Sequence, residues 1–180
     1  MNETSNTVLI PVKGLPMGEN SFSFAIDGKF FQGFENSQIK DADCTVKVKV
    51  VRHQTLLNAT CTVGGFVVCE CDRCLDDLTL KVDVERVLTV GFGNVDVDEE
   101  SEEEDVMIVD SSESEISLDQ FVYDYICLSL PLVKTHAPGK CNPEMVKYLT
   151  DRDASSQASQ KDAASSPFKD LKDMLNKKNN

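Results

Sequence analysis

The chain has 180 residues, 41% of them hydrophobic and none of them tryptophan, which suffices for one domain with tails or two very small ones. Its formal net charge is −13, so the chain lacks the excess of basic residues that is expected for RNA binding by counterion release. No apolar run approaches the roughly 18 residues of a membrane span, and the start lacks the basic and apolar regions of a signal peptide. We therefore expect a cytoplasmic protein without membrane contact, in which thiols stay reduced.

Two alternating patterns near the start of the chain predict β-strands. In residues 20–27, phenylalanine and isoleucine occupy one face and small residues the other, which is the period of a half-buried strand. In residues 44–52, valines alternate with Lys47 and Lys49, so this strand has a solvated lysine face. Residues 7–12 predict a further short strand.

The β pattern continues through residues 55–63, 66–70 and 78–90. The pair Gly64-Gly65 predicts a turn or bulge between the first two segments. In the third segment, the alternation of apolar residues breaks near residues 85 and 86, which predicts a second bulge or a bend. No connection between these strands offers a clear crossover helix, so we expect antiparallel hairpins to connect them.

An acidic run interrupts the chain after these strands. Residues 96–115 hold 11 acids and no base, whereas the remaining 20 acids and 18 bases nearly balance. Like charges repel, so the run is expected to be a mobile, solvated loop, or a surface for a basic protein. Its apolar residues 106–109 predict a short strand or a local docking segment.

Residues 117–130 have the clearest helix pattern, with a broad apolar face and Pro131 at its end. Ser117 is expected to be the N-cap, with Gln120 completing a capping box three residues later.

A linker and a short helix are expected at the end of the chain. Residues 149–165 have the serine, alanine and aspartate content of a flexible linker, and residues 166–180 open with a serine and a proline that favour a helix start. Phe168, Leu171 and Leu175 lie on one side of this helix. It either packs on its own domain or binds a partner.

Two pairs of side chains have the spacing of metal ligands. Cys71 and Cys74 form a CxxC pair between predicted strands, and His136 and Cys141 follow the predicted helix as an H-x4-C pair. Three sulfurs and one nitrogen would complete a tetrahedral zinc site, which has no open position and is therefore structural. A set of thiols without metal and a thioredoxin-like redox pair remain as alternatives, although the flanking strands disfavour the redox pair.

The residues around the CxxC pair allow more than one role. Asp72 and Arg73 either form a local ion pair, are simply exposed or contact a partner. Cys69 points the same way as Cys71 by strand alternation, so it either substitutes as a ligand or packs. The remaining cysteines are expected to be small buried hydrophobes: Cys44, Cys61 and Cys127.

The chain resembles the YceD family, the large ribosomal RNA subunit accumulation proteins of bacteria and plastids, and in particular its Bacteroides-like members. The resemblance implies a role in accumulation of 23S ribosomal RNA and in assembly of the large ribosomal subunit, without a known catalytic activity. It rests on several segments in a characteristic order: residues 14–31, CECDRCL at 69–75, the helix at 116–131, His136 with Cys141, and SPFKDLKDML at 166–175.

These patterns together predict an α+β fold. We expect a mostly antiparallel sheet or partly open barrel with one main helix over residues 1–148, followed by the linker and the short C-terminal helix. The expected function is a non-enzymatic factor that binds a ribosomal protein or 23S pre-rRNA. The alternatives are a metal-stabilised module that binds RNA directly through Lys47, Lys49 and Arg52, and a thiol redox protein. The residues expected to contact a partner are Lys47, Lys49, Arg73, Phe168, Leu171 and Leu175.

Overall fold

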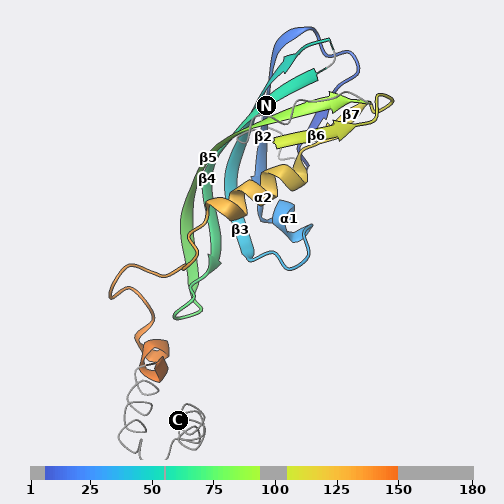
Figure 1. Cartoon of the computed structure of the whole chain (residues 1–180). Coiled ribbons are helices and arrows are strands. Elements are labelled where there is room, and N and C mark those ends of the chain that lie inside the picture. Colours follow the sequence, from blue (N-terminus) through green and yellow to red (C-terminus); the bar gives the residue numbers. More distant parts are fainter. Residues whose placement is uncertain (1–6, 55, 94–104, 150–180) are drawn as a thin grey trace, which may run out of the picture. The chain divides into compact units, whose positions relative to one another are not determined.

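The computed structural model describes residues 7–54, 56–93 and 105–149. The chain divides into two compact units, one up to Thr135 and one from His136 onward. Of the second unit, residues 136–149 are described, and residues 143–149 are helical. The elements of the first unit are β1 (Leu9–Pro11), β2 (Gly18–Asp27), α1 (Gly28–Gln32), β3 (Ile39–Arg52), β4 (Leu56–Glu70), β5 (Asp77–Phe92), β6 (Asp105–Val109), β7 (Glu115–Ser117) and α2 (Asp119–Ser129) (Figure 1).

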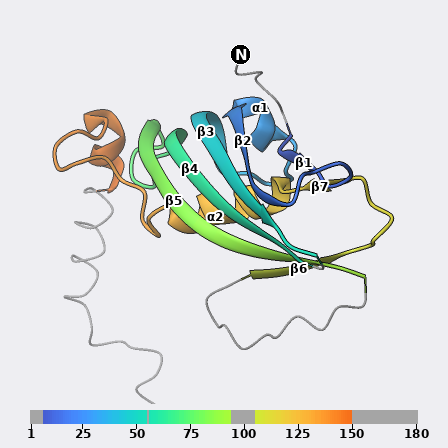
Figure 2. The ribbon, with the colours of Figure 1, turned by 90° about the horizontal axis from the view of Figure 1, so that it is seen from above.

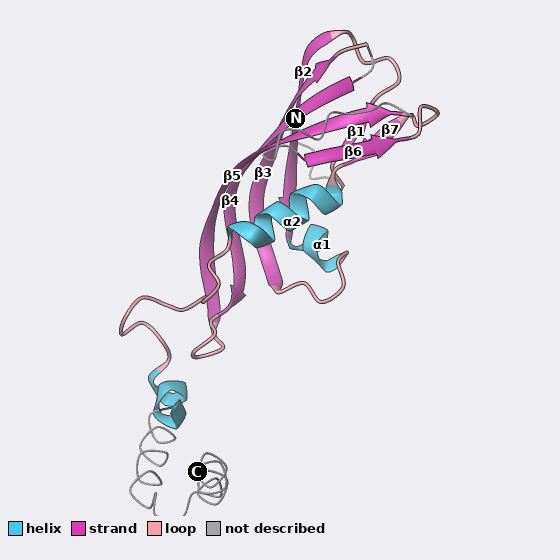
Figure 3. Cartoon of the chain, viewed as in Figure 1, coloured by secondary structure: helices cyan, strands magenta, loops and turns pink. Residues whose placement is uncertain are grey.

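The first unit is an α+β fold, as predicted, in which strands predominate and the helices are short (Figure 3). Its main sheet has five strands in the order β2-β3-β4-β5-β6 and is not closed into a barrel (Figure 2). Strands β2 to β5 form an antiparallel meander, and β1 pairs with β7 in a separate two-stranded sheet.

The predicted antiparallel pairing is confirmed for β2 to β5, whereas β6, which follows the acidic run and was not part of that prediction, pairs with β5 in parallel. A parallel neighbour needs about a dozen connecting residues but does not require a helix, and the chain between Phe92 and Asp105 has that length. The predicted short strand at 106–109 is confirmed as β6.

The predicted interruption at Gly64-Gly65 is absent, because both residues lie inside the continuous strand β4. Gly65 has a φ of +154°, and a Cβ built there would lie 2.2 Å from the backbone oxygen of Asp43 on β3. Glycine is therefore required by the close approach of two paired strands and not by a turn.

The phase change near residues 85 and 86 is also not a bulge, because β4 and β5 pair in unbroken register from Leu56 opposite Gly91 to Glu70 opposite Asp77. Instead, β5 becomes buried on both faces from Leu88 to Gly91, which removes the alternation. The register shift occurs elsewhere, between Ile39 and Asp41 of β3.

Both helices contribute to a core on one face of the sheet. Helix α1 packs on β3, and α2 packs on β4 and β5 (Figures 1 and 2). The rings of Phe34, after α1, and Tyr123 of α2 stack at a centroid distance of 4.0 Å. On the opposite face, Lys47 and Lys49 are exposed, as the alternation predicted. Among the described residues, no helix has the length and apolarity to span a membrane.

The start of α2 differs from the predicted capping box. Leu118 occupies the N-cap position and makes no side-chain cap hydrogen bond, whereas Ser117 belongs to β7, pairs with Leu9 and accepts a hydrogen bond from the Asp119 N–H at 3.3 Å. The Asp119 carboxylate instead accepts a hydrogen bond from the Val8 N–H at 2.5 Å. The beginning of α2 is thereby attached to the N-terminal strand.

The two adjacent glycines of β4 provide a matched stability test. Gly65→Ala should lower the free energy of unfolding by about 2 kcal/mol or more, because its methyl group would meet the β3 backbone. Gly64→Ala, with no atom within 4 Å of its Cβ, should change stability by less than about 0.5 kcal/mol. Urea unfolding of both variants measures the difference, and equal stabilities would contradict this account.

Candidate functional site

The turn between β4 and β5 carries the CxxC pair. The Cys71 N–H donates to the Asp76 oxygen and the Leu75 N–H donates to the Cys71 oxygen, both at 2.9 Å. Leu75 adopts a φ of +62°, a conformation that costs free energy for a residue with a bulky side chain. The turn buries both Cys71 and Cys74. Two sulfurs are thus held at one tight, hydrogen-bonded reversal of the chain.

Asp72, inside this turn, fixes the segment that follows α2. Its N–H donates to the Lys134 oxygen at 2.7 Å, and its carboxylate accepts from the Lys134 N–H at 2.5 Å. The Lys134 Nζ also lies 3.7 Å from the other oxygen of the Asp72 carboxylate. Hydrogen bonds to a charged acceptor are stronger than neutral ones. The predicted alternative of a local pair with Arg73 was wrong, since Asp72 bonds to a residue distant in sequence.

Chain continuity then restricts His136. It follows Lys134 by two residues, and each residue spans at most about 3.6 Å. The hydrogen bonds of Asp72 therefore deliver the start of the H-x4-C segment to the neighbourhood of the CxxC turn.

The H-x4-C segment forms a small loop of its own in the second unit. The Lys140 N–H donates to the Ala137 oxygen at 2.9 Å, and Gly139 takes a φ of +79° that favours glycine. This reversal places the Cys141 Sγ 4.0 Å from the His136 Nδ1, and both side chains are half-buried.

The four side chains make one group that could hold a metal ion. One ligand atom from each of Cys71, Cys74, His136 and Cys141 lies within 4.8 Å of all the others. Bonds of about 2.3 Å in a tetrahedral site place two sulfurs about 3.8 Å apart, so a small contraction would suffice for zinc. The structure thus brings together the four residues that the sequence singled out.

The neighbouring sulfur of Cys69 does not belong to this group. It is buried, and its Sγ lies 3.7 Å from the Leu78 oxygen. Cys69 therefore packs between strands.

Cys44 and Cys61 are also buried, as predicted, and burial raises the pKa of Cys44 to about 11 and that of Cys61 to about 12. Cys127, which belongs to α2, is half-buried and not fully buried as predicted.

The residues expected to contact a partner lie in separate places. Lys47 and Lys49 line a shallow hollow of about 360 Å³ on the outer face of the sheet, where the Lys49 Nζ lies 3.1 Å from a Glu19 oxygen. Arg73 is exposed on the CxxC turn. The three expected in the C-terminal helix lie outside the described residues: Phe168, Leu171 and Leu175.

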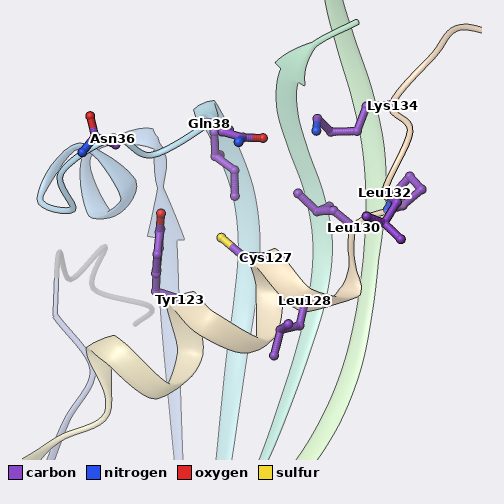
Figure 4. A pocket seen from close by; sticks show the side chains of 10 residues that line it. Asn36, Gln38, Tyr123, Cys127, Leu128, Leu130, Leu132 and Lys134 are labelled. Carbon is purple, nitrogen blue, oxygen red and sulfur yellow. The ribbon is translucent and has the colours of Figure 1, made fainter. Parts of the chain in front are cut away.

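The hydrogen bonds between Asp72 and Lys134, which hold the CxxC turn next to the segment after α2, were not predicted from the sequence. They are separated by 62 positions, and no local pattern marks either as half of a pair. A groove beside α2, lined in part by Cys127 and Leu128, was also missed because its walls come from three separate segments (Figure 4).

One comparison with known proteins gives a match. The profile of the family described as large ribosomal RNA subunit accumulation protein YceD matches residues 59–175. The match begins within β4 and includes the CxxC turn, α2 and the H-x4-C segment. No curated protein and no solved structure matches the chain. Because the family profile covers more than half of the sequence, the chain belongs to the YceD family, whose name indicates a role in accumulation of large-subunit ribosomal RNA.

Proposed function

We propose that the protein is a non-enzymatic factor for 23S ribosomal RNA accumulation and large-subunit assembly, and that it acts in the cytoplasm by binding a ribosomal protein. The observation that carries this proposal is the family match over residues 59–175. The net charge of −13 favours a basic protein over bare RNA as the direct partner, because like-charged surfaces repel.

Zinc is the cofactor that best suits the Cys3His group. Three sulfurs and one imidazole nitrogen are soft to borderline ligands that favour a tetrahedral ion. Cys71 and Cys74 would bind from the β4–β5 turn, and His136 and Cys141 from the segment after α2. A bound ion would stabilise the deprotonated thiols and join the two segments. Four protein ligands leave no position for a substrate, so this proposal includes no catalytic step.

Direct RNA binding is the second candidate, and the hollow on the outer sheet face is the observation that favours it. Lys47 and Lys49 stand there among hydroxyl side chains that can donate hydrogen bonds to phosphate oxygens. Against it, Glu19 already pairs with Lys49, which lowers the net positive charge of this surface.

Metal analysis tests the proposed cofactor. The purified protein should contain about one zinc ion per chain, and Cys71→Ser/Cys74→Ser should lose it, because two of four ligands are removed. Cys127→Ser is the matched control and should retain zinc, since Cys127 lies outside the group.

Thiol mapping gives an independent readout of the same site. A chelator should expose Cys71, Cys74 and Cys141 to alkylation at pH 8. Cys44 and Cys61 should stay unreacted, because burial raises the pKa of the first to about 11 and of the second to about 12. Absence of zinc together with an unchanged alkylation pattern would refute the metal site.

Depletion of the protein tests the proposed function. We expect the amount of 23S relative to 16S ribosomal RNA to fall and free large subunits to become scarce, with rescue by the wild-type chain. Normal 23S amounts and normal subunit profiles would contradict the proposal.

Charge reversal then distinguishes the two kinds of partner. Lys47→Glu/Lys49→Glu should leave capture of a basic ribosomal protein intact, because exposed lysines do not attract a partner of the same charge. Salt-sensitive binding of 23S fragments that this double variant abolishes would instead support the direct RNA candidate.

A further inference from the structure

Strand β6 (Asp105–Val109) is the last strand of the main sheet, and among the described strands it pairs with β5 alone (Figure 2). The Gly93 N–H, directly after β5, donates to the Val109 oxygen at 2.9 Å, so the Val109 C=O points toward β5. In an extended strand, the N–H and C=O of one residue point to the same side, and those of the next residue point to the other side. The N–H and C=O groups of Val106 and Ile108 therefore point away from β5, toward the open edge of the sheet.

This edge is already in the extended form that a further strand would need. The side chains of Met107 and Val109 pack against the core. The Tyr125 hydroxyl of α2 donates a hydrogen bond to the Asp105 carboxylate at the start of β6, and the Arg86 guanidinium lies 5.2 Å from the centre of the Tyr125 ring. Because β6 is fixed to β5 and α2, a chain that pairs with it orders only its own backbone.

Apolar side chains stand on the open edge. Val106 is 39% exposed and Ile108 is 63% exposed, on the face of the sheet opposite Met107 and Val109. A strand laid beside β6 would bring its own side chains to about 5 Å from these two, and apolar pairs at that distance stabilise a sheet. An apolar edge of this kind pairs with any extended chain unless nearby charges select which chains can approach.

The charges beside β6 are negative. The strand lies inside the run 96–115, which holds 11 acids and no base. Asp110 and Glu113 directly follow β6 and are exposed. The bases Arg86 and Lys13 also reach this region, the second by donating to the turn after β6, but they offset only two of these charges. A second copy of this chain would place acid against acid, and RNA would be repelled by the same charges.

We propose that β6 is the docking edge for an extended, basic segment of the partner protein, which adds a strand to the main sheet. Hydrogen bonds to the backbone of Val106 and Ile108 hold the segment, and its apolar side chains contact theirs. Lysines or arginines of the segment face the acids beside β6. This inference rests on the proposed function, because it names the surface through which the factor binds a basic ribosomal protein.

Ile108→Pro tests the backbone contact. Proline removes an N–H that points to the open edge and no hydrogen bond to β5. The probe is the total protein extracted from large ribosomal subunits, offered to the immobilised full chain. Wild-type chain should retain at least one basic protein, and Ile108→Pro should bind that protein at least about tenfold more weakly. The matched control Ile108→Val keeps the N–H and a branched apolar side chain, and it should bind like wild type.

Asp110→Asn/Glu113→Lys tests the charge contact. The asparagine keeps the oxygen that accepts the Ser112 N–H, so the turn is preserved. This variant should bind the same basic protein about fivefold more weakly or worse, because attraction to its cations is reduced. Glu35→Lys/Asp83→Asn changes the net charge equally at exposed positions outside β6 and should bind like wild type. Urea unfolding shows whether any variant is destabilised, and the charge variant decides the question if the proline variant fails to fold.

Rescue of depleted cells separates this inference from the proposed function. Where depletion lowers 23S ribosomal RNA, Ile108→Val should restore it and Ile108→Pro should not. Full rescue by Ile108→Pro, equal binding by all variants, or no basic protein retained by the wild-type chain would overturn the docking edge. So would dimers or bound 23S fragments that Ile108→Pro abolishes, since they would assign β6 to a second copy or to RNA. Normal 23S amounts after depletion would instead refute the proposed function, and the binding comparison would still decide the role of β6.

Discussion

Asp72 and Lys134 exchange two hydrogen bonds between positions 62 apart, and the arrangement of the candidate site depends on them. One partner lies inside the CxxC turn and the other lies two residues before His136. The carboxylate accepts a backbone N–H and also lies near the Lys134 ammonium, which is mostly buried. The two halves of the Cys3His group are therefore brought together by protein contacts, which lower the entropic cost of closing the long loop between them.

The sheet carries this contact at one end and separates a face covered by helices from an uncovered face. Helices cover one face of the sheet, and the cysteine-bearing turn extends from the end of the long hairpin of β4 and β5. The other face stays polar, with Lys47 and Lys49 exposed. The apolar groove adjoins α2 and shares Lys134 with the contact that fixes the CxxC turn. The segment that follows α2 therefore both borders the groove and holds the cysteine turn.

Local patterns predicted those features that depend on local chemistry. Alternation revealed the strands and the exposed lysines, and ligand spacing identified the four residues of the Cys3His group. Features that depend on distant segments were missed or misread. Gly65 is required by a backbone that approaches from β3, and the start of α2 is held by Val8. The short strand at 106–109 was predicted, but its parallel pairing with β5 was not, because the direction of pairing is not encoded in the segment's own pattern.

The zinc affinity of Asp72→Ala, measured by competition with a chromophoric chelator, tests the central claim most directly. Asp72 is not a proposed ligand, so a loss of affinity larger than the loss of one nearby negative charge explains reports on the position of the segment at Lys134. The account predicts that wild-type protein binds one zinc ion and that the variant binds it about 10- to 100-fold more weakly, as happens when groups that orient metal ligands are removed. Equal affinities, or no zinc binding by the wild-type chain, would contradict it.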